Sequence, residues 1–378
     1  MKEEIAPAQL EAATGTMNVR AFGAKGDGLG DDTAAIRAAI QAAPKEGGVV
    51  FFPPGRYRSD VIAAPSHTTF LGHAAWSYTA PGGTVISPLR EDQPCLFDAV
   101  GSKGTRWVGL SLEGLGLGRE IHGIMSGRKD SEQNIVVDDC QINHFSGSGI
   151  HLRNAHVWVV RHSILKGNGI DGIDADNSYD AWILDNQIVI NGRAGIRGEA
   201  LASMQIIGNR IEHNGRAGIL GGPRWPANLQ INGNSFCSNV GPGIDLSGEE
   251  SLRTGGKVVA PSVAITGNHF RYNASHLEEI ASIDDPAMDC HLRLCHLCNV
   301  AVTGNTLFTW RGHNNQISHP YYGMIIGHLR DAVILGNAMY QAGFRELIRD
   351  EGGHVNLVLR DNPGCLEKDG VPAGGFTP

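Results

Sequence analysis

The sequence has few aromatic residues, no long apolar run and no excess of basic residues. Aromatic residues make up 6% of the 378 residues, lysine and arginine number 31 against 39 acidic residues, and the formal net charge is −8. A mildly acidic chain without a basic stripe is not expected to bind nucleic acid through its phosphates. No apolar run is long enough to cross a bilayer, so we expect no membrane partner.

The cysteines and the N-terminus add two further exclusions. Seven cysteines are an odd number, so a fully paired disulfide framework is excluded and free thiols are expected. Residues 1–15 are polar and contain no apolar segment typical of a signal peptide. The compartment stays open: secreted or periplasmic if a signal has been removed, and cytoplasmic otherwise.

What the sequence does contain is a repeat. The phrase Gly-Ile recurs with isoleucines at 150, 173, 196, 219 and 244, which are 23, 23, 23 and 25 residues apart, and it occurs earlier at Ile124. A second marker, an asparagine preceded by glycine or aspartate, recurs at Asn186, Asn209, Asn234, Asn268, Asn305 and Asn337, and Asn362 extends the series. A fixed period of this length is typical of a solenoid, in which each unit buries its apolar face against its neighbours.

The repeat unit favours a parallel β-helix. Short β-branched runs such as Val157–Val160 and Met204–Ile207 are separated by Gly and Asn turns, and no helical periodicity fills the space between them. We therefore predict an all-β, right-handed parallel β-helix whose coils stack about 4.8 Å apart. The asparagines would form a ladder at one turn, each amide bonding to backbone groups and to the next amide.

The N-terminal part predicts a cap. An apolar-periodic segment, Ala34–Ala43, follows Asp32 and Thr33, either of which would cap a helix, and Pro44 would end it. An amphipathic helix at the first coil covers an open sheet edge. We predict a leader at 1–16 and one β-helix domain at 17–378, with the cap signature at 17–60, repeated coils at 104–362 and a tail at 363–378.

The stretch Asn18–Tyr57, with its Phe-Gly-Ala-Lys-Gly-Asp-Gly and Asp-Asp-Thr phrases, resembles the N-terminal signature of the pectate-lyase-like β-helix superfamily. The resemblance is to the branch that includes polygalacturonase-related proteins and phage tailspikes. Cys295–Asn305 is also similar to a stretch in inulin fructotransferases, and trimeric members of the superfamily imply a homotrimer. The resemblance implies an enzyme acting on a polysaccharide, although a fold does not fix a chemistry.

The residue after each repeated isoleucine is expected to point outward, because side chains alternate along a strand. This gives one outward column, and a second lies two residues further along. The first contains Met125, His151, Asp174, Arg197, Leu220 and Asp245, and the second contains Arg153, Asp176 and Glu199. Ionisable residues therefore gather in the coils between 149 and 199.

Two interpretations of this patch stay open. It is either a solvated face of cross-strand ion pairs, each worth about 0.2–1 kcal/mol, or a catalytic site. Asp176 stacked on Glu199 would place like charges together, which is destabilising unless a proton, a cation or an arginine intervenes. Such a pair suits acid/base chemistry on a glycosidic bond.

We therefore predict a glycoside hydrolase or transglycosidase on a poly- or oligosaccharide. Asp174, Asp176 and Glu199 would be catalytic, and the predicted substrate-binding residues are His151, Arg153, Arg197, Asp171, Lys166, Trp225 and Asp245. The alternatives are a lyase or epimerase, in which the acidic residues would hold Ca²⁺, a fructotransferase-like enzyme that forms an anhydro-sugar, and a non-catalytic carbohydrate-binding or spike module. Otherwise no cofactor is expected.

Three further features have competing interpretations. Arg193 and Arg216 recur in Gly-Arg-Ala-Gly and are interpreted as turn residues. Trp158 and Trp182 are predicted to point outward together. The cysteines between Cys290 and Cys298 are interpreted as buried thiols rather than a zinc site. They lie in one segment, and the sequence has no second group of zinc ligands at a matching spacing elsewhere.

Overall fold

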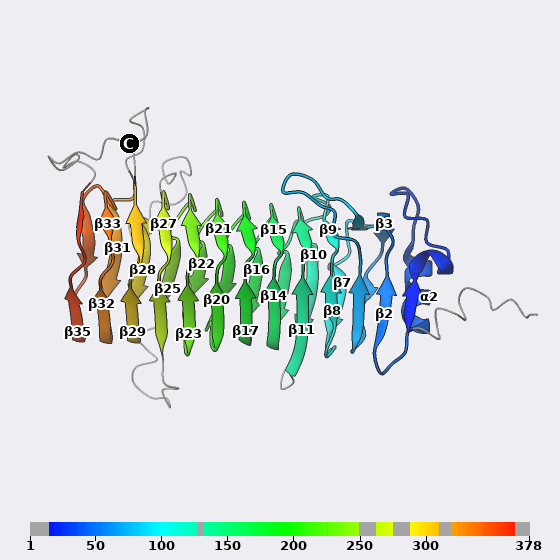
Figure 1. The fold of residues 1–378 in the computed structure, drawn as a ribbon, viewed down its shortest axis with the longest axis horizontal. Helices are drawn as coiled ribbons and strands as arrows, with labels where there is room; N and C mark the ends of the chain where they lie inside the picture. The colour runs from blue at the N-terminus through cyan, green and yellow to red at the C-terminus, as the bar shows by residue number, and fades with distance from the viewer. Residues whose placement is uncertain are drawn as a thin grey trace, which may run out of the picture. The chain divides into compact units, whose positions relative to one another are not determined.

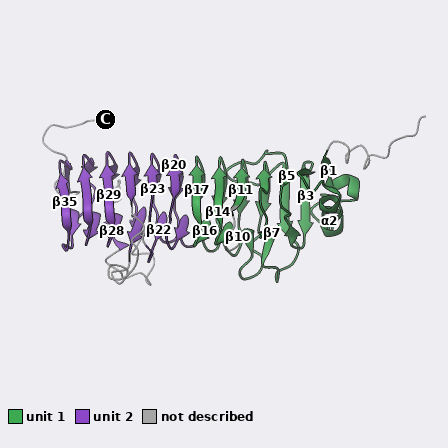
Figure 2. Cartoon of the chain, turned by 90° about the horizontal axis from the view of Figure 1, so that it is seen from below, with its two compact units in different colours: residues 1–187 green, residues 188–378 purple. Residues whose placement is uncertain are grey.

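The structure is a computed structural model that describes residues 15–127, 132–224, 226–248, 262–274, 288–309 and 319–366. It contains two compact units, residues 1–187 and 188–378, coloured separately in Figure 2. Each unit consists of coils of a right-handed parallel β-helix, as predicted. The prediction of one domain over 17–378 stays a prediction.

Each coil of unit 1 contributes strands to three parallel sheets, called A, B and C here (Figure 1). Sheet A contains β1 (Thr16–Asn18), β2 (Gly48–Phe51), β5 (Thr68–Leu71), β8 (Arg106–Val108), β11 (Glu132–Asp138), β14 (His156–Arg161) and β17 (Tyr179–Leu184). Sheet B contains β3 (Gly55–Ser59), β6 (Thr84–Pro88), β9 (Ser111–Glu113), β12 (Gln141–Asn143) and β15 (Ile164–Lys166). Sheet C contains β4 (Ile62–Ala63), β7 (Cys95–Val100), β10 (His122–Gly127), β13 (Ile150–Arg153) and β16 (Ile173–Asp176).

Unit 2 repeats this arrangement, and β18 (Gln187–Val189) lies at the boundary. Its sheet A contains β20 (Met204–Ile207), β23 (Leu229–Asn232), β26 (Val263–Thr266), β29 (Cys298–Thr303), β32 (Arg330–Leu335) and β35 (Val355–Arg360). Its sheet B contains β21 (Arg210–Glu212), β24 (Ser235–Cys237), β27 (His269–Arg271) and β30 (Thr306–Phe308), and a separate pair is formed by β33 (Met339–Tyr340) and β36 (Gly364–Cys365). Its sheet C contains β19 (Ile196–Gly198), β22 (Ile219–Gly221), β25 (Ile244–Ser247), β28 (Cys290–Cys295), β31 (Tyr322–Gly327) and β34 (Glu346–Asp350).

The predicted N-terminal capping helix is confirmed, but the Asp32 side chain does not form the predicted cap hydrogen bond. A short 3-10 helix, η1 (Val19–Phe22), precedes α2 (Thr33–Ala42), whose Ile36 and Ala39 are buried at the first coils. Asp32 occupies the cap position but accepts from Lys25 N–H (2.7 Å) and Arg58 N–H (3.3 Å), so it fixes the preceding loop. Asp31 accepts from Thr33 N–H (2.8 Å) instead.

The coils also extend beyond the predicted range of 104–362. Strand pairing already begins with Thr16 opposite Val49 in β1 and β2, so the first coil includes the last residue of the predicted leader. Pairing continues to Cys365, inside the predicted tail. The early coils lack the Gly-Ile and Asn markers, which is why the sequence pattern missed them.

The repeated Gly-Ile phrase has a packing explanation. The six isoleucines are fully buried, so the predicted core positions are confirmed. A Cβ atom on Gly123 would lie 2.4 Å from the Gly149 carbonyl oxygen, and one on Gly218 would lie 2.5 Å from that of Gly243. Only glycine permits this approach between neighbouring coils.

The predicted asparagine ladder is confirmed in unit 2. Amide-to-amide hydrogen bonds of 2.8–3.0 Å run in sequence through Asn209, Asn234, Asn268, Asn305, Asn337 and Asn362. The glycine before each central asparagine has a positive φ, for example 62° at Gly233, which favours glycine at this turn. A second ladder, which the sequence interpretation missed, joins Asn191, Asn214, Asn239 and Asn273 at the next turn.

None of the helices among the described residues has the length and apolar composition that a membrane crossing needs.

Replacing Asn268 with alanine is expected to destabilise the protein by about 1–3 kcal/mol, because buried partners lose their hydrogen bonds. The Asn268 amide donates to the Ile231 carbonyl (2.8 Å) and to Asn305 Oδ1 (3.0 Å), and its oxygen accepts from Asn234 N–H (2.9 Å). Denaturant unfolding measures the effect. Thr266→Ala, on the exposed side of β26, is the control, expected to change stability by less than about 0.5 kcal/mol. Equal effects of the two substitutions would show that the ladder does not stabilise the coils.

Candidate active site

In unit 1 the predicted ionisable residues meet on the outer side of sheet C. His151 on β13 lies opposite Asp174 on β16, and Arg153 lies opposite Asp176, as the column pattern predicts. The alternate residues Leu152 and Ala175 are buried in the core, so the four ionisable side chains share the outer face. We call these four residues, together with His122, the unit 1 cluster.

Asp174 is the central acceptor of this cluster. Its side chain is 4% exposed, and its Oδ2 accepts a hydrogen bond from Arg153 Nη2 (2.8 Å). The same oxygen lies 3.3 Å from His151 Nδ1. This second contact has an ion-pair distance but not hydrogen-bond geometry, since Nδ1 has no aligned partner. Asp174 Oδ2 therefore has both the Arg153 guanidinium and the His151 ring within 3.3 Å.

His122 is a residue of this cluster that the sequence interpretation missed. Its ring stacks on that of His151, with centroids 4.0 Å apart and an interplanar angle of 25°. Its Nδ1 accepts from Ser148 N–H (2.9 Å). Burial, with a smaller contribution from His151, lowers its pKa to about 4, so His122 is neutral at neutral pH. Only positions after the repeated isoleucines were considered, whereas His122 precedes Gly123-Ile124.

The predicted pair of stacked carboxylates has separate basic partners. Asp176 Oδ2 lies 3.9 Å from Arg153 Nε in unit 1, and Glu199 Oε2 lies 3.4 Å from Arg224 Nε in unit 2. Arginine is one of the groups expected to relieve a like-charge pair. Among the described residues, Asp176 Oδ1 is buried and has no hydrogen-bond partner.

Unit 2 contains a pocket of about 340 Å³ on the outer side of its sheet C. Four arginines line it, together with an acidic residue and a serine: Arg193, Arg197, Arg216, Arg293, Asp245 and Ser247. Arg293 Nη1 donates to Asp245 Oδ1 (2.9 Å), and Asp245 is 7% exposed on its side chain. We call this the arginine pocket.

The arginine pocket adds to the sequence interpretation. Arg193 and Arg216, which were interpreted as turn residues, also line this pocket. The 23-residue spacing of their Gly-Arg-Ala-Gly phrases is a signal that would have identified them. Arg293 was missed because a long insertion separates it from the coil of Ile244, although Ile244 pairs with Leu292.

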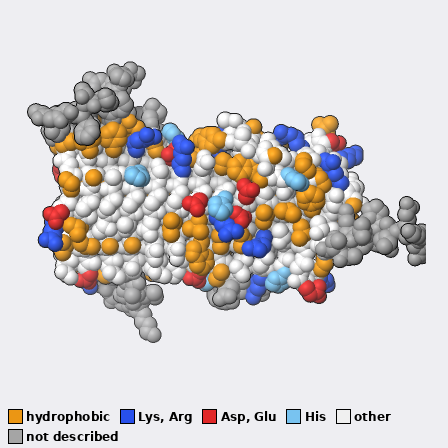
Figure 3. Space-filling model, in the orientation of Figure 1, with side chains coloured by type: hydrophobic (Ala, Val, Ile, Leu, Met, Phe, Trp, Pro, Cys, Tyr) orange, Lys and Arg blue, Asp and Glu red, His pale blue; other side chains and the backbone are white. Residues whose placement is uncertain are grey.

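The local gathering of arginines contrasts with the net charge of −8. On the visible face of Figure 3, lysine and arginine side chains lie in small groups, several of them beside acidic or histidine side chains. Arginine binds carboxylates in a planar, two-pronged geometry, so four of them in one pocket favour an anionic ligand.

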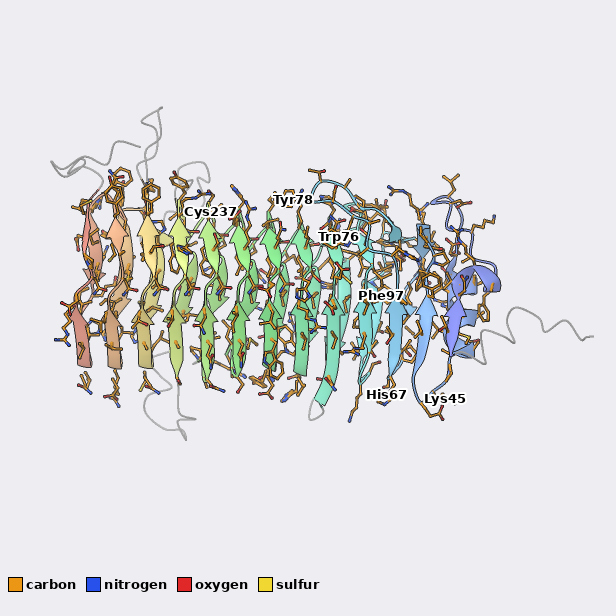
Figure 4. The ribbon with its side chains drawn as sticks, viewed as in Figure 1. Lys45, His67, Trp76, Tyr78, Phe97 and Cys237 are labelled. Carbon is orange, nitrogen blue, oxygen red and sulfur yellow. The ribbon has the colours of Figure 1, made fainter. Side chains whose placement is uncertain are left out.

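Two predicted substrate-binding residues lie elsewhere. Asp171 is fully buried, so its side chain cannot border a cleft. Lys166 lies on sheet B, not sheet C, because the chain turns between β15 and β16. Its Nζ donates to the Tyr78 carbonyl (3.0 Å) and lies 4.3 Å from the centre of the Tyr78 ring. Figure 4 shows Tyr78 and Trp76 in the loop between β5 and β6, so Lys166 anchors that loop.

The tryptophan predictions have mixed outcomes. Trp225 lies outside the described residues. Trp158 is fully buried and pairs with Ala181, whereas Trp182 is 38% exposed and pairs with Val159. The prediction of a shared outward face is wrong because the two tryptophans are 24 residues apart and the coil period is 23.

The cysteines are free, and Cys290 and Cys295 are buried. Burial raises the pKa of Cys295 to about 11, so its thiol is protonated and is a poor metal ligand. Within the described residues, no group of three His, Cys, Asp or Glu side chains is arranged to hold a metal ion.

Comparison with known families gives one match. Residues 16–220, more than half of the chain, match the family described as rhamnogalacturonase A/epimerase, pectate lyase-like. The match includes Asn18–Tyr57, so the resemblance to the pectate-lyase-like superfamily is confirmed.

Curated relatives match about half of the chain. The mannuronan C5-epimerase AlgE6 of Azotobacter vinelandii is 29% identical over 194 residues, which cover 47% of this chain and 22% of the epimerase. Alginate lyase 7 of the same organism is 30% identical over 200 residues, which cover 47% of this chain and 23% of the lyase. The aligned part thus spans under a quarter of each relative.

Solved structures agree on the fold. The A-module of the Azotobacter vinelandii mannuronan C5-epimerase AlgE4 superposes with a TM-score of 0.66 at 18% identity, covering 92% of this chain and 99% of the module.

The stability of the protein is expected to fall as the pH decreases from 6.5 to about 4. The pKa of His122 moves from 6.5 to about 4 on folding, so in this range the unfolded chain binds a proton that the folded chain excludes. His122→Asn should weaken this pH dependence without abolishing it. The remaining dependence comes from the buried His291, whose pKa is also lowered, to about 3. Unfolding measured between pH 4 and 7 tests this, with the exposed His73→Asn as control. An unchanged slope in His122→Asn would contradict it.

Proposed function

Because the chain belongs to the rhamnogalacturonase A/epimerase, pectate lyase-like family, we propose that it is an enzyme acting on a uronate-containing polysaccharide or oligosaccharide. The proposed reaction begins with removal of the proton next to the sugar carboxylate. Return of a proton to the opposite face gives an epimer, and loss of the linked sugar gives an unsaturated product. Relatives named for mannuronan C5-epimerisation and alginate lysis support this choice.

The observation that carries the proposal is the arginine pocket of unit 2. Removing a proton beside a carboxylate develops negative charge on that carboxylate, and fixed positive groups stabilise it. Arg193, Arg197, Arg216 and Arg293 supply such groups in one pocket.

The unit 1 cluster, taken by itself, is a second candidate site that contains a candidate proton acceptor. His151 is 14% exposed on its side chain, and its Nδ1 lies 3.3 Å from Asp174 Oδ2. A histidine beside a carboxylate is a common general base. In this proposal Asp174 is a positioning residue, and Asp176 and Arg153 bind sugar hydroxyls.

Hydrolysis is the second candidate, and one observation favours it. Asp174 and Asp176 lie two positions apart on β16, so both carboxyl groups project from its outer face. Arg153 contacts both carboxylates, at 2.8 and 3.9 Å. We rank hydrolysis second because the curated relatives reported above are named as an epimerase and a lyase.

A panel of polymannuronate, polyguluronate, polygalacturonate and a neutral β-glucan tests the proposal. Wild type is expected to act on at least one polyuronate and not on the glucan. Nuclear magnetic resonance detects inversion at C5, and mass spectrometry detects unsaturated products without added water. Products heavier by one water would establish the second candidate, and activity on the neutral glucan alone would contradict the anionic substrate.

Arg216→Gln is expected to lower kcat/KM on the active polyuronate by at least about tenfold, because a positive group of the pocket is lost. Arg360→Gln is the matched control, since Arg360 is on sheet A of the same unit with a side chain 70% exposed. Equal activity of the two variants would remove the arginine pocket from the reaction.

His151→Gln is expected to lower kcat by about 10²–10⁴, the usual contribution of a general base. The pH dependence of the residual rate should also differ from that of wild type. His73→Gln, with an exposed ring, is the control for loss of a histidine. A variant that keeps both the rate and the pH profile would show that His151 is not the base.

A further inference from the structure

We infer that the arginine pocket is closed at one end and that it therefore binds the terminus of a uronate chain rather than its interior. The closing structure, called the wall here, consists of His319, Tyr321, Tyr322, Ile325 and Arg345. The inference rests on the proposed function, since it takes a uronate sugar as the ligand.

The wall adjoins the pocket along the chain. Met288 lines the pocket, and the next residue, Asp289, holds the base of the wall. Its Oδ1 accepts from Tyr321 N–H (2.8 Å), and its Oδ2 lies 2.8 Å from His319 Nδ1. Cys290 then packs with Tyr322 and Ile325 in a buried apolar cluster that Tyr321 covers. Met288 and Asp289 are adjacent in sequence, and they thus connect the pocket lining to the base of the wall.

The strand register shows where the pocket ends. Asp245, Arg293 and Ile325 occupy the same outward column on β25, β28 and β31. The first two line the pocket, whereas Ile325 is fully buried although its column faces outward. A sugar chain that follows this column along unit 2 would therefore meet the wall directly after Arg293.

The wall is held in place by stacked rings and charges. The Tyr321 ring lies between the His319 ring, 4.4 Å away, and the Arg345 guanidinium, 3.8 Å away. Arg349 Nη1 donates to Tyr322 Oη (2.9 Å), and its guanidinium lies 5.0 Å from the centre of the Tyr322 ring. Cation–π contacts of this kind stabilise a preformed surface.

A closed end next to arginines selects a particular ligand. The terminal uronate would place its carboxylate among the arginines and its free end against the wall. A bulky group on that end would collide with Tyr321 and Arg345, while a group on the other end would be tolerated. The wall would therefore be a specificity-determining element that favours action at chain ends.

Calorimetric binding of three trisaccharides of the active uronate tests this: unlabelled, labelled at the reducing end, and labelled at the non-reducing end. Wild-type protein is expected to bind the unlabelled and one labelled form with Kd values within about threefold. The other labelled form should bind at least about tenfold more weakly. Tyr321→Ala should reduce this difference to within about threefold.

Arg345→Ala serves as a second variant, because Arg345 is exposed and its loss shortens the wall while every side chain of the buried cluster is kept. Tyr340→Ala, at a tyrosine 42% exposed on β33 of unit 2, is the control and should keep the wild-type difference. Equal affinity of the two labelled forms for wild type, or an unchanged difference in both wall variants, would overturn the inference while leaving the proposed function intact. Failure of wild type to bind the unlabelled form would instead overturn the proposed function.

Discussion

The close stacking of successive coils is the constraint on which the rest of this structure depends. Parallel strands about 4.8 Å apart require every inward side chain, every turn and every backbone group to repeat along the stack. Glycine carbonyls of one coil approach the glycines of the previous coil too closely for a Cβ atom. The amide ladders satisfy buried turn groups at the same spacing, which an apolar side chain could not do.

The same stacking creates the candidate sites. A regular coil places outward residues of neighbouring strands in columns, so residues 23 apart in sequence become neighbours on sheet C. The unit 1 cluster uses this to bring His151, Arg153 and Asp174 together around one carboxylate oxygen. The arginine pocket of unit 2 combines the column with residues of the preceding turn, Arg193 and Arg216. Electrostatic recognition of an anion therefore arises from a chain whose total charge is negative.

Much of the fold could be predicted from the repeat itself. The buried isoleucines, the asparagine ladder, the capping helix and the pairing of His151 with Asp174 all follow from a fixed period and from alternation along strands. The prediction for Trp158 failed because its register along the strand differs by one residue from the one assumed. Trp158 therefore lies in the core and not on the predicted surface. The arginine pocket was harder to predict, since Arg293 follows an insertion that breaks the period.

The sequence by itself determined the coil, its core positions and the outward columns, because stacking forces a one-dimensional pattern that can be counted along the chain. The tertiary structure decided which polar residues have partners. Asp171 is buried, Lys166 contacts the Tyr78 loop, His122 stacks on His151, and Tyr321 packs against the buried cluster of Cys290, Tyr322 and Ile325. These outcomes depend on turns, loops and insertions, where contacts form between residues without a fixed separation and the periodic pattern carries no information.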